Sequence, residues 1–172
     1  MALYALDDRE PTIDPKAWVH PDAVIIGDVR IGARSSVWPC AVLRGDYGSI
    51  VVGEETSLQD GVVVHATAEL DTLIGSRVVV GHLAHLEGCR VEDASLVGVG
   101  SVVLHRAVVG TGATVGAGAV VTNGMVVPAG ALAVGVPAQV REGRSDREMI
   151  EASARVYVAN ASRFARGLRR LD

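Results

Sequence analysis

The sequence predicts an all-β fold, a parallel β-helix built from hexapeptides, followed by one C-terminal α-helix. Three observations carry this prediction. Aliphatic residues recur every six positions, glycine often follows them, and the end of the chain changes to the periodicity of a helix. We place the β-helix in residues 1–143 and the helix, packed on it, in residues 144–172.

The period of six distinguishes a coiled strand structure from a helix, which repeats every 3.6 residues, and from a flat strand, which alternates every two. The aliphatic residues in this register are Val19, Ile25, Ile31, Val37, Leu43, Val52, Leu58, Val64, Ile74, Val80, Leu86, Val91, Val97, Val103, Val109, Val115 and Val121. Six residues are three strand alternations with a corner, and three units close one triangular coil of about 18 residues. The repeats suffice for about seven coils.

The C-terminal segment carries helix signals. Ser145 and Glu148 have the spacing of a capping box, in which a serine and a glutamate satisfy free amides at a helix N-terminus. An apolar stripe follows at spacings of three and four. Its members are Ile150, Ala154, Tyr157, Ala161, Phe164, Leu168 and Leu171. We expect this helix to pack along the β-helix.

Composition excludes several classes of function. The net charge of −4 gives no general attraction to nucleic acid or to anionic membranes. No apolar stretch is long enough to span a membrane, and the N-terminal residues lack a secretion signal. We therefore expect a cytoplasmic protein that binds no nucleic acid and no membrane. Cys40 and Cys89 are far apart in sequence, and we expect both to be small buried thiols.

Two polar residues are predicted to stack at one corner. His65 and Glu87 each follow the inward aliphatic residue of the third hexapeptide of a coil, one coil apart. Their backbones should lie about 5 Å from each other, so one ion could bridge the side chains. His85 points outward beside Glu87, as a substitute ligand, a supporting residue or a surface residue.

His82 lies on a different stretch of the same coil. Five extended residues separate it from Glu87, which is roughly 16 Å of chain. One chain cannot easily bring His82 to an ion held by His65 and Glu87, whereas a neighbouring chain in a cyclic assembly could. A metal site formed by these residues should therefore lie between subunits of an oligomer.

Three motifs in this order resemble those of the gamma-class carbonic anhydrase-like family of hexapeptide proteins. They are LRGD (Leu43–Asp46), SLQDGVVVH (Ser57–His65) and the GH and GC pairs within Gly81–Cys89. The resemblance implies a left-handed β-helix homotrimer that acts on a small molecule. It also implies reversible hydration of carbon dioxide at a divalent metal, most often zinc with iron or cobalt as alternatives, at each subunit interface.

The resemblance also implies residue roles. His65 is a metal ligand from one subunit and His82 a ligand from its neighbour. Arg44 and Asp46 look like the interface ion pair of the family. Gln59 looks like the side chain that orients the reacting water or the substrate, and Asp60 resembles a nearby polar residue. Glu69 and His85 are weak candidates for moving the proton.

Glu87 departs from the family motif, in which a third histidine ligand stands at this place. Two histidines and one carboxylate are an accepted zinc ligand set, so His65, His82 and Glu87 could hold the metal. The anionic ligand should weaken ionisation of a bound water. Two alternatives remain: His85 takes the third place, or no metal binds.

Two other functions compete with the carbonic anhydrase-like lyase. Many hexapeptide β-helices are acyltransferases that use acetyl-coenzyme A, although the short excursions of this chain count against a long catalytic loop. The third reading is a non-catalytic trimeric scaffold or binding protein with a degenerate metal site. Glu87 keeps that reading open. His20 and His105 have no partner pattern, and we expect both to be surface residues.

Overall fold

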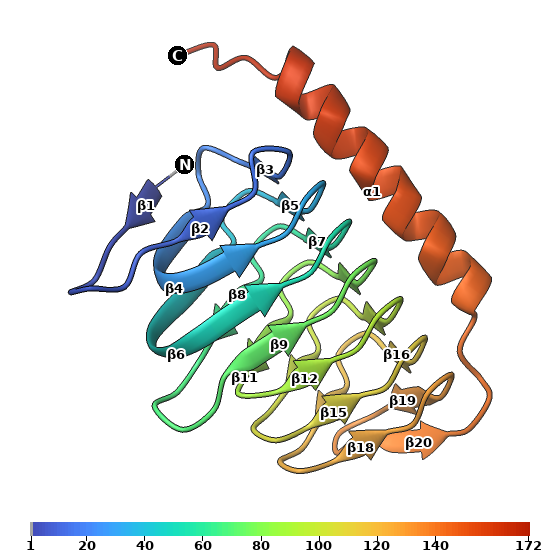
Figure 1. Cartoon of the computed structure of the whole chain (residues 1–172). Coiled ribbons are helices and arrows are strands. Elements are labelled where there is room, and N and C mark those ends of the chain that lie inside the picture. The colour runs from blue at the N-terminus through green and yellow to red at the C-terminus, as the bar shows by residue number, and fades with distance from the viewer. Residues whose placement is uncertain (1) are drawn as a thin grey trace.

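The computed structural model describes residues 2–172, which form a three-sided parallel β-helix with one long helix along its side (Figure 1). The strands are β1 (Ala2–Tyr4), β2 (Thr12–Ile13), β3 (Trp18–Val19), β4 (Val24–Ile31), β5 (Ser36–Val37), β6 (Val42–Val52), β7 (Ser57–Leu58), β8 (Val63–His65), β9 (Thr72–Ile74), β10 (Val79–Val80), β11 (His85–Glu87), β12 (Arg90–Val91), β13 (Leu96–Val97), β14 (Val102–Val103), β15 (Val108–Val109), β16 (Thr114–Val115), β17 (Val120–Val121), β18 (Val126–Val127), β19 (Leu132–Val134) and β20 (Gln139–Arg141). The helix is α1 (Arg147–Gly167).

The strands stack into three faces. The first face contains β1, β8, β11, β14 and β17 with the first halves of β4 and β6. The second contains β2, β9, β12, β15 and β18 with the second halves of β4 and β6, which bend around the corner between the two faces. The third is the sheet from β3 to β20, and α1 lies along it (Figure 1). The predicted fold of about seven coils is confirmed.

The hexapeptide aliphatic residues fill the interior. From Ile25 to Val121 each is at most 3% exposed, and the series continues through Val127 and Ala133. The side chain two residues earlier also points inward, and it is small in most coils, as at Ala41, Ala84 and Ala113. Pairing one branched side chain with one small side chain at each turn fills a narrow interior without voids. Val19, in the first coil, is only half-buried.

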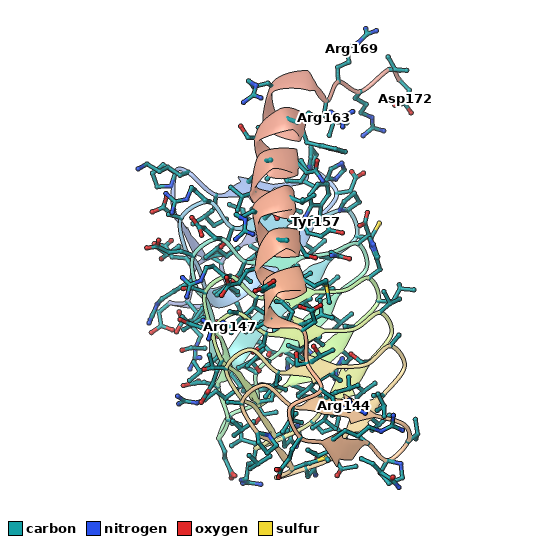
Figure 2. The ribbon with its side chains drawn as sticks, turned by 90° about the vertical axis from the view of Figure 1, so that its right-hand side faces the viewer. Arg144, Arg147, Tyr157, Arg163, Arg169 and Asp172 are labelled. Carbon is teal, nitrogen blue, oxygen red and sulfur yellow. The ribbon has the colours of Figure 1, made fainter. Side chains whose placement is uncertain are left out.

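Helix α1 is held by an aromatic cluster at one end of the β-helix. Phe164 lies against Trp18 and Trp38, with ring centroids 5.7 and 5.0 Å away, and Tyr157 lies 5.8 Å from Trp38. Trp38 Nε1 donates to the hydroxyls of two serines on the third face. Figure 2 looks onto α1, which lies along the β-helix with Tyr157 near the middle of the helix. The predicted packing of the helix is therefore confirmed.

Two details of the helix differ from the sequence prediction. The N-cap is Asp146, whose carboxylate accepts from Met149 N at 3.0 Å, whereas the hydroxyl of Ser145 bonds to Thr114 at 2.6 Å. The predicted capping box is therefore wrong, because the Ser145 hydroxyl bonds to Thr114 on the third face and does not cap the helix. The apolar stripe also ends early, since α1 stops at Gly167 and Leu171 is exposed.

The two cysteines have different environments. Cys89 is buried, as expected, and burial raises the pKa of its thiol to about 12. Cys40 is exposed at a corner in the left-handed conformation, with φ 59°, so the prediction that it is buried was wrong. Between residues 2 and 172, no helix has the length and apolarity needed to cross a membrane.

Candidate functional site

Two clusters of histidine and carboxylate lie at the two edges of the first face. The first cluster, at the corner toward the second face, contains His65, Glu87 and Asp46. The second, at the corner toward the third face, is the pair of His82 and Asp60. Each edge receives its residues from consecutive coils because the parallel strands stack in register.

The imidazole of His65 lies between two carboxylates. Its Nδ1 is 2.7 Å from Glu87 Oε1, and its Nε2 is 3.0 Å from Asp46 Oδ1. Glu87 pairs with His65 in the β8–β11 ladder, so the predicted stacking of these two residues is confirmed. Ionised carboxylates only accept hydrogen bonds, so both contacts are hydrogen bonds only when both ring nitrogens carry hydrogen.

The two carboxylates are held in their charged form. The hydrogen bond from His65 is the main cause of the lowered pKa of Glu87 and outweighs burial, which raises it. For Asp46 burial is the largest influence and raises the pKa, but the bonds from His65, its own backbone amide and Arg44 together lower it below the usual value. Arg44 donates to Asp46 at this corner, where the resemblance places an ion pair.

Two further histidines approach Glu87. His85 Nε2 is 3.4 Å from Glu87 Oε2, and His105 Nε2 is 3.7 Å from Glu87 Oε1. The His105 nitrogen is buried and makes no hydrogen bond within residues 2–172. The side chain of His105 is 35% exposed, as expected of a surface residue, but its contact with Glu87 was not expected. His105 follows Glu87 by one coil of sequence, so the hexapeptide register predicts that the two residues stack.

His82 has a simpler environment. Its Nδ1 lies 2.9 Å from Asp60 Oδ2, and both side chains are 47% exposed. Its Nε2 has no partner in the part of the chain that the structure describes. The two groups are not aligned for a hydrogen bond, but the charge of Asp60 beside Nδ1 favours hydrogen on that nitrogen and leaves Nε2 free to accept a proton or bind a metal.

Gln59 lies at the edge of His82 and not in the His65 cluster. Its side chain is 4% exposed and faces a groove beside α1, together with Tyr157. Gln59 immediately precedes Asp60, so both belong to one corner. Glu69 lies in the excursion after β8 and is mostly exposed, 4.0 Å from Arg106. His20 is half-buried against Trp18, with ring centroids 5.8 Å apart.

One chain does not assemble a metal site. Among residues 2–172 no three donor side chains converge on one point. Both nitrogens of His65 already face carboxylates, and His82 lies at the other edge of the first face. The donor types nevertheless suit zinc, which accepts two imidazoles and one carboxylate. A complete site would therefore need His82 from a second chain and a His65 nitrogen released from Asp46.

Known proteins resemble this chain over most of its length. The family model "Bacterial transferase hexapeptide (six repeats)" matches residues 10–45. The carnitine operon protein CaiE of Escherichia coli K12 is 39% identical over 149 residues, which are 87% of this chain and 76% of CaiE.

Two solved structures resemble the whole chain. A Bacillus cereus protein called a "putative acetyltransferase" has a TM-score of 0.93 at 32% identity, covering 95% of this chain and 96% of its own. A hexapeptide transferase family protein of Anaplasma phagocytophilum has a TM-score of 0.91 at 37% identity, covering 95% and 98%. The chain therefore belongs to the hexapeptide-repeat family of left-handed β-helix proteins that includes CaiE.

Proposed function

We propose that this protein is an acyltransferase that takes its acyl group from a thioester and uses His82 as general base. The observation that carries the proposal is the contact of 2.9 Å between His82 Nδ1 and Asp60. A base oriented by a carboxylate, with its other nitrogen exposed, is the arrangement that activates a weak nucleophile.

The reaction needs one proton transfer in each direction. Nε2 of His82 takes the proton of an acceptor hydroxyl or amine while the acceptor atom attacks the carbonyl carbon of the thioester. The carbon–sulfur bond then breaks, and the departing sulfur takes the proton from Nε2, which restores the neutral imidazole. The negative charge of Asp60 beside Nδ1 favours hydrogen on that nitrogen and stabilises the imidazolium that forms between the two steps.

The first cluster is less suited to this task. Both nitrogens of His65 contact carboxylates, and its side chain is only 16% exposed. His65 therefore connects three consecutive coils at the corner, and His82 remains as the accessible base. The descriptions of the Bacillus cereus and Anaplasma phagocytophilum proteins, as an acetyltransferase and a hexapeptide transferase, favour the same reaction class.

The test is release of free thiol from acyl-coenzyme A by protein treated with a chelator. We expect release faster than in buffer alone, even with water as acceptor, and faster still with an added amine or hydroxyl acceptor. Chelation should not change the rate, because no step requires a metal. Release no faster than in buffer, for every acyl-coenzyme A and acceptor, would contradict the proposal.

A second candidate is hydration of carbon dioxide at a metal between the subunits of a homotrimer. The stacking of Glu87 on His65 favours it, because these residues occupy the two ligand places expected within one subunit. His82 of a neighbouring subunit would supply the third place, with zinc as the first choice and iron or cobalt as alternatives. A divalent metal bound there would increase the acidity of water.

The residues around those three ligands would have supporting roles in this second function. Arg44 and Asp46 would hold the interface, and Asp60 would orient His82. Gln59 would orient the water or carbon dioxide from the edge of His82, and His85 would relay the proton because it contacts Glu87. This function requires a bound divalent ion after purification without chelators, and carbon dioxide hydration that chelation abolishes.

The two tests together separate the three readings. Thiol release that survives chelation supports acyl transfer, and hydration that depends on metal supports the second candidate. Absence of both leaves a trimeric binding protein or scaffold with a degenerate site. A monomer in solution would remove the second candidate, because no other chain could supply His82.

A further inference from the structure

A groove runs along the edge of the third face, beside α1. Its floor is one column of residues that each follow an inward aliphatic residue in consecutive coils. Bulky side chains occupy the start of this column, at Trp38 and Gln59, and three glycines follow: Gly81, Gly98 and Gly116. Val134 closes the other end, since a Cβ on Gly116 would meet its side chain at 2.8 Å.

The walls of the groove are mostly apolar. Val79, Leu96 and Val99 contribute from the β-helix, and Ser153 and Tyr157 contribute from α1. Figure 2 shows α1 along the β-helix, with Tyr157 midway between its ends. The groove has a volume of about 340 Å³, within the range of small-molecule sites. Three stacked glycines give a floor about 10 Å long, the reach of an extended chain of about eight carbons.

The three glycines of the floor offer no free hydrogen-bond donors. The amide of Gly81 donates to Val97 O at 2.7 Å, and the amides of Gly98 and Gly116 donate to the next coil at 2.8 Å. An amide-bearing chain laid on this floor would lose its hydrogen bonds to water without replacement, which costs free energy. An alkyl chain has no such groups to lose. The glycine floor therefore favours an alkyl chain over the amide-containing arm of coenzyme A.

The residues that precede the candidate base and its carboxylate in sequence line one end of the groove. Gln59 and Gly81 line it, and the next residue in each case is Asp60 or His82. Tyr157 lies close to the same corner. Burial is the main cause of its raised pKa, and the charge of Asp60 adds to that shift. A chain lying in the groove would thus have one end at the corner that carries Asp60 and His82.

We propose that this groove binds the alkyl part of the acyl group of the thioester substrate and places the thioester carbonyl at His82. The inference deepens the proposed acyl transfer and rests on it for the identity of the reacting group. It assigns the protein to thioesters with medium-length acyl chains, because the glycine floor ends at Val134.

The test is equilibrium binding of acetyl-, butanoyl-, hexanoyl- and octanoyl-coenzyme A to the full chain by calorimetry, which does not depend on turnover. We expect each added methylene to tighten binding about twofold, which corresponds to half the free energy of a fully buried methylene. Octanoyl-coenzyme A, with six more methylenes, should therefore bind about 60-fold tighter than acetyl-coenzyme A. Longer chains should gain nothing further.

Ser153→Trp fills the groove from the helix, and Ala152→Trp is the matched control because Ala152 is exposed next to it and does not line the groove. Ser153→Trp should reduce the ratio of octanoyl to acetyl affinity to about one, whereas Ala152→Trp should keep the wild-type ratio. Circular dichroism and melting temperature check that both variants fold.

Each outcome decides the inference. Equal affinity for all four chain lengths, or an equal loss for all four in Ser153→Trp, would overturn it and would assign the groove to the carrier arm. Binding that depends on chain length without any thiol release would support the groove and remove acyl transfer as the function. Thiol release without chain-length dependence would support acyl transfer and remove the groove.

Discussion

His65 and His82 lie at the two edges of the same face, and their surroundings differ in one respect. Carboxylates contact both nitrogens of His65, from Glu87 and Asp46, whereas a carboxylate contacts only one nitrogen of His82. The His65 imidazole is closed, with both nitrogens engaged, and connects three consecutive coils, whereas the His82 imidazole is open, with one nitrogen free. In this chain the number of acidic neighbours therefore distinguishes two histidines that the sequence alone presents as equivalent candidates.

The largest expected effect is on catalysis at the open edge. His82→Ala should lower kcat/KM for thiol release by about 100-fold or more, the usual contribution of a general base. Its melting temperature should stay that of the wild type, because the side chain is half-exposed. Asp60→Asn should cost less than His82→Ala, since it removes the orienting carboxylate and leaves the base. A wild-type kcat/KM for thiol release in His82→Ala would contradict the role of His82 as the base.

Glu87→His tests whether the closed edge is a modified metal site. The substitution replaces a carboxylate that contacts His65 with a neutral imidazole and restores the third histidine of the family motif. We expect bound zinc to rise to about one ion per subunit, since three imidazoles form an open catalytic zinc site. Metal analysis after growth with added zinc measures this. An unchanged zinc content would show that the closed edge is structural.

His65→Ala should affect stability more than activity. It leaves Glu87 and Asp46 facing each other without the imidazole that bonds to both. Loss of such a partner costs about 1–3 kcal/mol, a fall in melting temperature of several degrees. Thermal unfolding of His65→Ala and His82→Ala compares the two edges directly. A larger fall in melting temperature for His82→Ala than for His65→Ala would contradict the structural role of His65.

Acid should weaken the closed edge. The pKa of Glu87 in the folded protein is below its ordinary value of 4.5, chiefly because His65 bonds to it. A lowered pKa gives stability that is complete above pH 4.5 and is lost as the pH falls through the folded value. Glu87→Gln should therefore lose less stability than the wild type between pH 5 and pH 3. Equal losses in denaturant titrations at those pH values would contradict this.

The smallest expected effect concerns the two thiols, one at each edge. Cys40 lies exposed at the edge of His82, and Cys89 lies buried next to the His65 cluster with a pKa raised to about 12. Only the thiolate reacts with a disulfide reagent. We expect one thiol to react in the native protein at pH 8 and the second only after unfolding. Cys40→Ala should remove the fast reaction and leave the fold intact.

The fold followed from the sequence because the hexapeptide register constrains every coil. The same register placed Glu87 on His65 correctly. The register also predicts the contact of Asp60 with His82, because these two residues are as far apart in sequence as His65 and Glu87. It likewise predicts the contact of His105 with Glu87, which lie one coil apart.

Other features could not be read from the register. Ser145 and Asp146 are both good N-cap residues, and the hydroxyl of Thr114 decides between them by engaging Ser145. Cys40 stands at a corner whose left-handed conformation turns its side chain outward. The groove depends on where α1 lies against the glycine column, and the position of a helix on a sheet is a property of packing.

The central claim is that His82 is the accessible, reactive histidine and that His65 is closed. Limited modification with diethyl pyrocarbonate, mapped by peptide mass spectrometry and followed by the thiol-release assay, tests it most directly. The account predicts that His82 is modified before His65 and that activity falls in proportion to modified His82. Earlier modification of His65, or loss of activity while His82 remains unmodified, would contradict it.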